Sequence, residues 1–204
     1  DLTPYVGDPT YGVDPRDFYN IFWTQDNVGR RRVAVPAQRS ARFMLWNQSW
    51  AADLGFVSVP KTTTDFELQA CRAHQAMLTD ATASNDGRGG WLVDTSWQTA
   101  FSWLLSFEGG VLEQNDYRFL TPNNIAAFKY LRLLSEKNCA WQAAGNVDPY
   151  QAFATREALF TSVSLEEFSD QSRAFGEAGN ADTWVALPYP GDAQAGLVAY
   201  GSSY

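Results

Sequence analysis

Residues 33–56 read VAVPAQRSARFMLWNQSWAADLGF, and this stretch sets the interpretation of the whole chain. Residues 41–46, ARFMLW, form an apolar run of strand length, and residues 49–55, SWAADLG, predict a short helix that Gly55 ends. Strand-like runs and capped helices keep alternating along the rest of the chain. The pattern predicts an α/β domain with a mixed sheet flanked by helices.

Helix signals occur on both sides of this stretch. Asp14 and Pro15 predict a helix that continues through residues 18–23, and Thr64 with Glu67 forms a capping box for a helix over residues 64–79. We expect a helix over residues 96–108 to carry a polar strip on one side, made by Gln98, Thr99, Ser102 and Ser106. A helix over residues 122–137 is apolar around most of its circumference, so we expect it to be buried on more than one side. Strands are predicted over residues 41–46, 91–93, 157–161 and 183–188.

Composition excludes several classes of function. The 204 residues carry 15 Lys and Arg against 23 Asp and Glu, a net charge of −8, which repels nucleic acids and anionic membranes. No run approaches the roughly 18 apolar residues of a membrane helix. Residues 1–12, DLTPYVGDPTYG, lack the basic start and apolar core of a signal peptide, so none is predicted there.

Metal and cofactor motifs are also missing from the sequence. His74, Cys71 and Cys139 are too few and too scattered for a zinc site, so no metal is expected. No glycine-rich nucleotide loop and no catalytic signature occurs, so no cofactor and no catalytic residue are expected. We interpret His74 as a residue on the surface of its helix.

The order of the segments resembles the extracytoplasmic solute-binding proteins of ABC importers, in the family that includes maltose- and glycerol-phosphate-binding proteins. The resemblance rests on residues 33–56 and on four further segments. These are PKTTTDFELQAC at 60–71, Gly109-Gly110 followed by TPNNIAAFKYLRLL at 121–134, AFATREALFTSVS at 152–164, and LPYPGDAQAGLVAYGSS at 187–203. It implies a periplasmic-binding-protein-like type II lobe.

The same resemblance implies a domain organisation. Residues 1–36 are similar to the end of the first lobe and the approach to the hinge, and residues 37–204 to the second lobe. The chain is therefore expected to be a truncated piece of a two-lobed protein. The family implies capture of a small solute, with a sugar favoured by the 15% aromatic content, and delivery to permease subunits. It further implies a monomer outside the cytoplasm, as a cell-surface lipoprotein or in the periplasm.

Candidate ligand-binding residues follow from position in the family. The crossings between lobes match Gln38, Arg39, Ser40, Gly201 and Ser202, and the cleft-lining segments match Trp97, Gln98, Ser162 and Ser164. A Trp offers a flat face to a sugar ring, and the polar groups offer hydrogen bonds to hydroxyls.

Each candidate also has a purely structural interpretation. Trp97 can belong to the core, as we expect for Trp103 and Phe107. Ser162 or Ser164 can cap the next helix, and Arg39 can be a solvated surface residue. Gln38 and Ser40 rest on position alone.

The two cysteines depend on the compartment. In a reducing compartment both would be free, whereas outside the cytoplasm a sparse pair usually bridges. The resemblance therefore implies a Cys71–Cys139 disulfide.

Two other classes of function remain open from the sequence. A glycoside hydrolase needs paired carboxylates, and the available candidates are Asp94, Glu108, Glu113, Glu166 and Glu167. A stand-alone carbohydrate-binding module needs only the aromatic and polar groups. Neither class has a recognisable motif in this chain.

Overall fold

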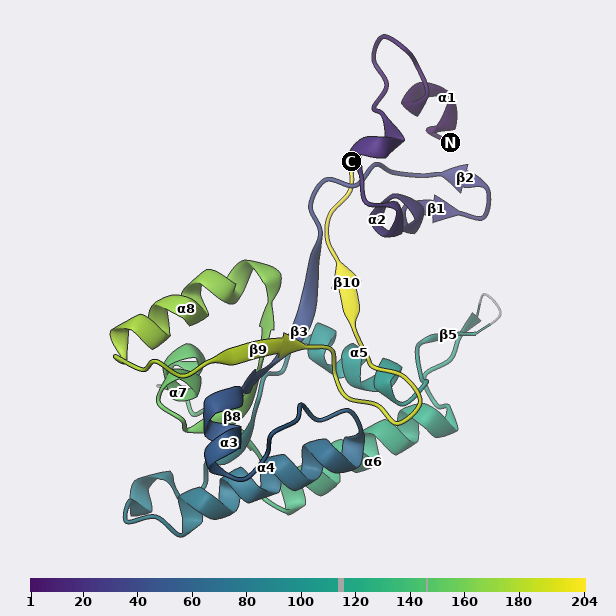
Figure 1. Cartoon of the computed structure of the whole chain (residues 1–204). Helices are drawn as coiled ribbons and strands as arrows, with labels where there is room; N and C mark the ends of the chain where they lie inside the picture. Colours follow the sequence, from purple (N-terminus) through teal and green to yellow (C-terminus); the bar gives the residue numbers. More distant parts are fainter. Residues whose placement is uncertain (114–115, 146) are drawn as a thin grey trace. The chain divides into compact units, whose positions relative to one another are not determined.

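The computed structural model describes residues 1–113, 116–145 and 147–204, and Figure 1 shows the order of their elements. The chain divides into two compact units, residues 1–41 with 199–204 and residues 42–198. Among the described residues, no helix combines the length and the apolar character that crossing a membrane requires. The described residues also contain no group of three or more His, Cys, Asp and Glu side chains placed to hold a metal ion.

The larger unit is built on a mixed sheet, as the sequence predicts. Its strands are β3 (Ser40–Asn47), β4 (Gly89–Val93), β7 (Ala140–Gln142), β8 (Ala158–Ser164), β9 (Trp184–Leu187) and β10 (Val198–Tyr200). The order is β10-β3-β8-β4-β7, and β9 also pairs with β3. Strand β4 runs parallel to β7 and β8, whereas β3 runs antiparallel to β8 and β9. The carboxyl ends of β4, β7 and β8 therefore lie at one edge of the sheet.

Helices cover both faces of this sheet (Figure 1). One apolar cluster joins Trp46 and Trp91 to residues of α3 (Gln48–Asp53), α4 (Thr63–Leu78), α5 (Trp97–Ser106) and α6 (Pro122–Glu136). A second cluster joins Leu45 and Leu92 to residues of α7 (Pro149–Ala154) and α8 (Phe168–Glu177). Consecutive strand residues point to opposite faces, so the alternation at 45–46 and 91–92 separates the two cores.

The capping box of α4 lies two residues before the predicted one. The cap is Thr62, whose hydroxyl accepts from the Asp65 N–H while the Asp65 carboxylate accepts from the Thr62 N–H. The prediction of Thr64 with Glu67 was wrong because T-x-x-D at 62–65 satisfies the same reciprocal geometry one half-turn earlier. One face of α4 packs into the core, since Phe66, Ala70 and Ala73 are fully buried.

Tertiary packing decides which faces of α5 and α6 are buried, and the expectation that α6 is buried on more than one side was wrong. The polar strip of α5 faces inward, because Ser102 and Ser106 are buried against the segment before β10. A Cβ on Gly196 would lie 2.0 Å from the Ser102 carbonyl oxygen, so small residues on both sides permit this close approach. Helix α6 is buried along one face only, and its Phe128 and Leu133 are exposed.

The smaller unit consists of short elements. It contains α1 (Thr3–Val6), the 3₁₀ turn η1 (Pro15–Asp17), α2 (Asn20–Gln25) and a hairpin of β1 (Asn27–Val28) with β2 (Arg31–Arg32). The helix predicted from Pro15 onward is split, because Phe18 and Tyr19 are extended and a new helix starts at Asn20. Arg32 lies over the Trp23 ring at 3.5 Å and holds the hairpin against α2.

Other short elements complete the larger unit. They are the 3₁₀ turns η2 (Ala83–Asn85) and η3 (Leu165–Glu167) and a hairpin of β5 (Leu112–Glu113) with β6 (Asp116–Tyr117). Asn138 follows α6 with a φ of 54°, and this left-handed conformation ends the helix.

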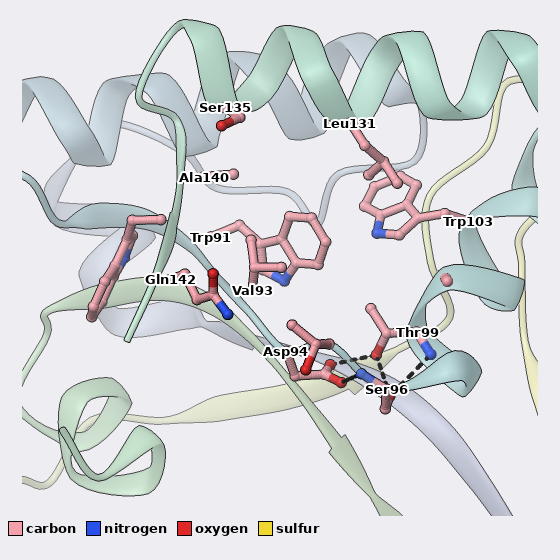
Figure 2. A pocket seen from close by; sticks show the side chains of 13 residues that line it. Trp91, Val93, Asp94, Ser96, Thr99, Trp103, Leu131, Ser135, Ala140 and Gln142 are labelled. Carbon is pink, nitrogen blue, oxygen red and sulfur yellow. Dashed lines mark hydrogen bonds between the residues drawn. The ribbon is translucent and has the colours of Figure 1, made fainter. Parts of the chain in front are cut away.

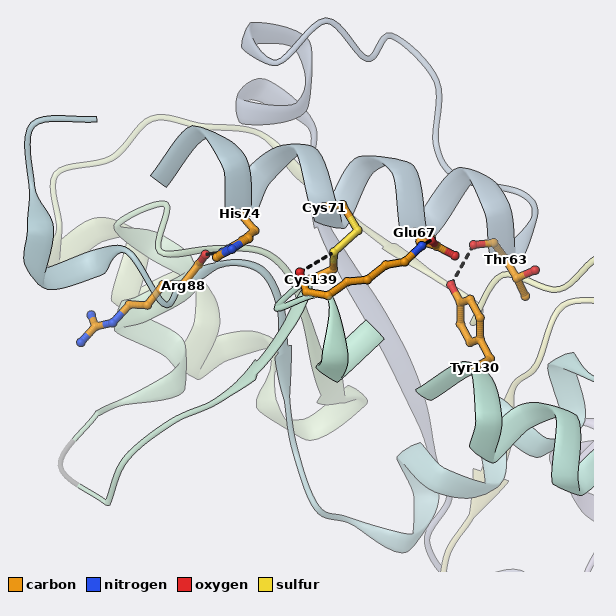
Figure 3. Close-up of a disulfide and its surroundings, with 8 residues drawn as sticks. Thr63, Glu67, Cys71, His74, Arg88, Tyr130 and Cys139 are labelled. Atoms are coloured by element: carbon orange, nitrogen blue, oxygen red, sulfur yellow. Dashed lines mark hydrogen bonds and ion pairs between the residues drawn. A yellow bond between two sulfur atoms is a disulfide. The ribbon is translucent and has the colours of Figure 1, made fainter. Parts of the chain in front are cut away.

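Cys71 and Cys139 form the predicted disulfide, with their Cα atoms 4.4 Å apart. It ties α4 to the start of β7 (Figure 3). A Glu67–Lys137 ion pair and a hydrogen bond from the Tyr130 hydroxyl to the Thr63 carbonyl connect the same neighbourhood. His74 sits half-buried on this helix, with Nδ1 3.0 Å from the Arg88 carbonyl oxygen.

Candidate functional site

The candidate site lies at the carboxyl edge of β4, β7 and β8. Asp94 directly follows β4, Ser96 caps α5, and Trp97 is the first residue of that helix. Ligands of α/β proteins bind outside the carboxyl ends of parallel strands, because helix starts and loop side chains converge there. The carboxyl edge of β4, β7 and β8 is therefore the candidate binding surface of the larger unit.

Arg42 organises the polar side chains at this edge. Its Nη2 lies 2.9 Å from Asp94 Oδ2, and its Nη1 donates to Glu167 Oε2 at 2.7 Å. The remaining N–H groups donate to Ser164 Oγ, the Ser162 carbonyl oxygen and Thr99 Oγ1. A guanidinium has five N–H donors, so all five are engaged within the protein.

The charges of this cluster shift several pKa values. Burial alone would raise the pKa of Asp94, but the Arg42 charge and the hydrogen bonds from Ser96, Thr99 and Arg42 lower it overall. Burial and a hydrogen bond to Glu167 raise the pKa of Tyr150. Burial likewise raises the pKa of Tyr189 to about 12, and its hydroxyl donates to Ser162 Oγ at 2.7 Å. Asp94 is thus held ionised and both phenols are held neutral.

Two hollows of about 280 Å³ each open at this edge and share Val93, Asp94, Thr95 and Gln142. One lies beside α7 and includes Arg42 and Tyr150. The other, the tryptophan cavity, lies between the sheet and helices α5 and α6 (Figure 2). Its walls are Trp91, Val93, Asp94, Thr95, Ser96, Thr99, Ala100, Trp103, Leu131, Ser135, Ala140, Trp141 and Gln142. Apolar walls with a few convergent polar groups are typical of small-molecule sites.

The candidates in the larger unit divide into exposed and buried groups. Trp97 is 60% exposed, so the core interpretation of this residue is wrong, whereas Trp103 is fully buried as expected. Gln98 follows Trp97 and is half-buried. Ser162 and Ser164 are buried. Ser164 caps η3, and its hydroxyl also accepts from Arg42, so the capping interpretation is confirmed for this residue.

The remaining candidates meet in the smaller unit. The Arg39 side chain is only 7% exposed and pairs with Asp26 at 2.7 Å, so the alternative of a solvated surface residue is wrong. Its NH groups also donate to the Gln38 and Ser202 carbonyl oxygens. Gly201 has a φ of +153°, and a Cβ there would lie 1.9 Å from the Gln38 carbonyl oxygen. These residues therefore hold two chain segments together, and Gln38 keeps an exposed side chain. Ser40 begins β3 and is buried.

Sequence reasoning missed Arg42, Tyr150, Tyr189 and Gln142 as parts of the edge. Arg42 had a usable signal, because a charged residue inside the apolar run ARFMLW must find partners once the strand is buried. Gln142 ends β7, Tyr150 lies in the first turn of α7 and Tyr189 follows β9, so only the fold brings the three together.

The carboxylates considered for glycoside hydrolysis do not form a catalytic pair of the usual kind. Such an enzyme needs one carboxyl group kept protonated, by burial, near neutral pH. Asp94 and Glu167 instead share the Arg42 guanidinium, and Asp94 is held ionised. Glu108 is exposed, and the side chain of Glu113 lies outside the described part of the chain.

The chain is similar to known proteins in its three-dimensional structure. No family model matches this sequence, and no curated protein matches it. The sugar-binding protein MalE from Xanthomonas citri is 20% identical with a TM-score of 0.77, covering 99% of this chain and 50% of its own. UgpB from Mycobacterium tuberculosis, solved with glycerophosphocholine, is 21% identical with a TM-score of 0.72, covering 100% and 48%.

A third structure extends the same pattern. The GacH receptor of Streptomyces glaucescens, solved unliganded and with acarbose, is 15% identical with a TM-score of 0.69, covering 93% of this chain and 48% of its own. The chain thus spans about half the length of the structures that it matches. The chain therefore has the α/β fold of these three structures, over about half of their length.

Proposed function

We propose that this chain is part of the solute-binding component of an ABC importer, which captures a small solute outside the cytoplasm and delivers it to the permease. The fold supports the solute-binding role. The ligand is proposed to be a sugar, since the chain is rich in aromatic residues and its carboxyl edge offers both aromatic faces and hydrogen-bonding groups.

The exposure of Trp97 is the single observation that carries this proposal. Trp97 is 60% exposed at the first turn of α5, so part of its flat aromatic surface is open to solvent, and such a surface can stack on a sugar ring. It begins the helix that follows the carboxyl end of β4, where ligands of α/β folds bind. Trp97 and Gln98 are therefore proposed to contact the solute, Trp97 by stacking on a sugar ring and Gln98 by hydrogen bonding.

The other candidates have supporting roles in this proposal. Ser162 and Ser164 fix Arg42 and Tyr189, and so position the edge. Gln38, Arg39, Ser40, Gly201 and Ser202 are proposed to form the crossings between two lobes, with residues 1–36 ending the first lobe and residues 37–204 forming the second. In that arrangement the solute is held between the lobes of a monomer.

A thermal-shift panel on the longest natural chain that contains these residues tests the proposal. The panel contains mono- and oligosaccharides, polyols, sugar phosphates and amino acids. A raised melting temperature with at least one saccharide or polyol is expected, because ligand that binds only the folded state stabilises it. Stabilisation by amino acids alone, or by no member of the panel, contradicts the proposal.

The 204-residue chain provides a second arm of the same experiment. It is expected to bind the identified solute weakly, because most of the opposing lobe is outside these residues. Equal affinity in the 204-residue chain and in the longest chain would favour a stand-alone binding module.

A further inference from the structure

Tyr189 brings three segments of the larger unit together at one phenol oxygen. Its hydroxyl donates to Ser162 Oγ at 2.7 Å and lies 3.1 Å from Thr99 Oγ1. Tyr189 follows β9, Ser162 lies in β8 and Thr99 lies in the first turn of α5. All three residues are buried, and Tyr189 is fully so. The contacts are therefore shielded from water, where a hydrogen bond is electrostatically stronger than at the surface.

Thr99 connects this phenol oxygen to the start of α5 and to Asp94. The Thr99 hydroxyl donates to Asp94 Oδ2 and accepts from Arg42 Nε at 3.2 Å. The Thr99 N–H donates to the hydroxyl of Ser96, the residue that caps the helix. Figure 2 shows Asp94, Ser96 and Thr99 joined by hydrogen bonds at the carboxyl edge. Since Trp97 lies between Ser96 and Thr99 in the chain, the contacts that hold Thr99 also set the position of the Trp97 backbone.

Tyr189 lies behind the candidate site and not in its walls. It lines neither hollow, whereas Ser162 lines the hollow beside α7 and Thr99 lines the tryptophan cavity. Burial raises the pKa of Tyr189 to about 12, so the hydroxyl keeps its proton at physiological pH. It therefore ties a wall residue of one hollow to a wall residue of the other, and any effect on a bound solute has to act through them.

Contacts that do not involve the hydroxyl hold the ring and the segment of Tyr189. The ring packs edge-to-face on Trp103, with the two centroids 5.3 Å apart. The Tyr189 N–H and carbonyl pair with Gly196 at 2.7 and 2.8 Å, and Gln194 Nε2 donates to the Leu105 carbonyl oxygen at 2.9 Å. Removing the hydroxyl alone therefore leaves this segment in place, so the role of the hydroxyl can be tested separately from the packing of the ring.

We infer that Tyr189 is a positioning residue for solute binding. Its hydroxyl fixes the first turn of α5 to β8, and so sets the place from which Trp97 and Gln98 reach the solute. The inference rests on the proposed function and adds to it a buried residue that acts on the solute only through its neighbours.

A matched pair of variants separates this role from general stability. Tyr189→Phe removes the hydroxyl and keeps the ring. Tyr130→Phe is the control, because Tyr130 also packs against Trp103 and its hydroxyl donates to the Thr63 carbonyl oxygen at 2.7 Å (Figure 3). That bond joins α6 to α4, and Tyr130 lines neither hollow. Both variants are expected to melt somewhat below the natural chain, because each leaves an acceptor without its donor.

The first measurement needs no solute. The longest natural chain that contains these residues is labelled with ¹⁵N-tryptophan, and the indole N–H signal of Trp97 is assigned by Trp97→Phe. Tyr189→Phe is expected to shift or broaden this signal, because the start of α5 is then held less firmly. Tyr130→Phe is expected to leave the Trp97 signal where it is in the natural chain.

The second measurement is isothermal titration with D-glucose, maltose and glycerol as probes. For a probe that binds the natural chain, Tyr189→Phe is expected to weaken affinity by roughly threefold to tenfold, the worth of about one hydrogen bond, and Tyr130→Phe by less than about twofold. Thr99→Val removes the Thr99 hydroxyl and keeps the shape of the side chain. Adding Tyr189→Phe to Thr99→Val is expected to lower affinity no further, because Tyr189 acts through Thr99.

Each outcome decides for or against the positioning role. Unchanged affinity in Tyr189→Phe overturns the inference, and so do equal losses of affinity in Tyr189→Phe and Tyr130→Phe, which would follow from lost stability alone. An additive loss in the double variant with Thr99→Val overturns the route through Thr99. A Trp97 signal that changes only in Tyr189→Phe, when no member of the thermal-shift panel binds the natural chain, upholds the positioning of α5 and contradicts the proposed function.

Discussion

Arg42 Nη2 lies 2.9 Å from Asp94 Oδ2, and this ion pair joins the first residues of β3 to the carboxyl end of β4. Glu167 binds the same guanidinium through Nη1, so one cation holds two carboxylates beside the candidate site. The cluster fixes Asp94 in its ionised form and sets the shape of the edge that Trp97 borders.

Replacing Arg42 with Met is expected to destabilise the protein by about 2–4 kcal/mol. Removing one partner of a buried ion pair leaves the other charge uncompensated, and here Asp94 and Glu167 both lose their cation. Urea unfolding followed by far-UV circular dichroism measures the change. Arg132→Met removes an exposed pair with Glu136 and is expected to cost less than about 0.5 kcal/mol. Equal costs for both variants contradict the structural role of Arg42.

Loss of the Cys71–Cys139 disulfide is expected to cost about 4 kcal/mol. It closes a loop of 68 residues, and the chain-entropy model ties the stabilisation to loop length. Comparing urea unfolding of the oxidised protein with that of Cys71→Ser/Cys139→Ser checks this value. An unfolding midpoint that the substitutions do not move contradicts it.

Two tryptophans six positions apart on α5 are expected to respond in opposite ways. Trp103→Ala removes a fully buried ring that packs against Phe66, Trp91 and Tyr189, so it is expected to lower the free energy of unfolding by about 3–5 kcal/mol. Trp97→Ala removes a largely exposed ring and is expected to cost less than about 1 kcal/mol. Thermal unfolding of both variants measures the two costs. A large loss of stability in Trp97→Ala would show that Trp97 packs as a core residue.

Asp182 is expected to make the free energy of unfolding depend on pH in the acid range. Its hydrogen bond from Arg156 lowers its pKa to about 2, against the opposing effect of burial and with help from Asn47 and Asn180. A lowered pKa gives stabilisation that is full above the unfolded pKa of 3.8 and is lost as the pH falls toward 2. We expect about 1–2 kcal/mol to disappear over this range.

Unfolding of Asp182→Asn at several pH values tests that expectation. The variant is expected to be less stable than the natural chain at neutral pH and to lose less stability between pH 4 and pH 2. Identical acid slopes for the two proteins would show that Asp182 does not carry the effect.

Local sequence signals predicted β3, β4, β8 and β9, but not β7, which is only three residues long. The run at 41–46 is recognisable because its apolar character depends only on neighbouring residues. The burial of the polar strip of α5 could not be predicted, because it depends on Gly196, almost a hundred residues later, which lets a second segment approach Ser102. Periodicity reports which residues share a face, but only tertiary packing decides which face is buried.

The candidate site was only partly accessible from the sequence for the same reason. Trp97 could be named from its position at a helix start after a strand. The tryptophan cavity could not, because Trp91, Trp103 and Trp141 lie on two strands and a helix that meet only in the folded sheet. Their indole N–H groups have no hydrogen-bond partner among the described residues, and this follows from how the side chains pack, which the sequence does not reveal.

Isothermal titration of the best saccharide or polyol from the thermal-shift panel into the longest natural chain and its Trp97→Ala variant tests the central claim most directly. The account predicts an affinity lower by roughly tenfold to a hundredfold in the variant, as for an aromatic anchor of about 1–3 kcal/mol, with the melting temperature of the free protein nearly unchanged. An affinity in Trp97→Ala equal to that of the natural chain would contradict the placement of the solute at the carboxyl edge of the sheet.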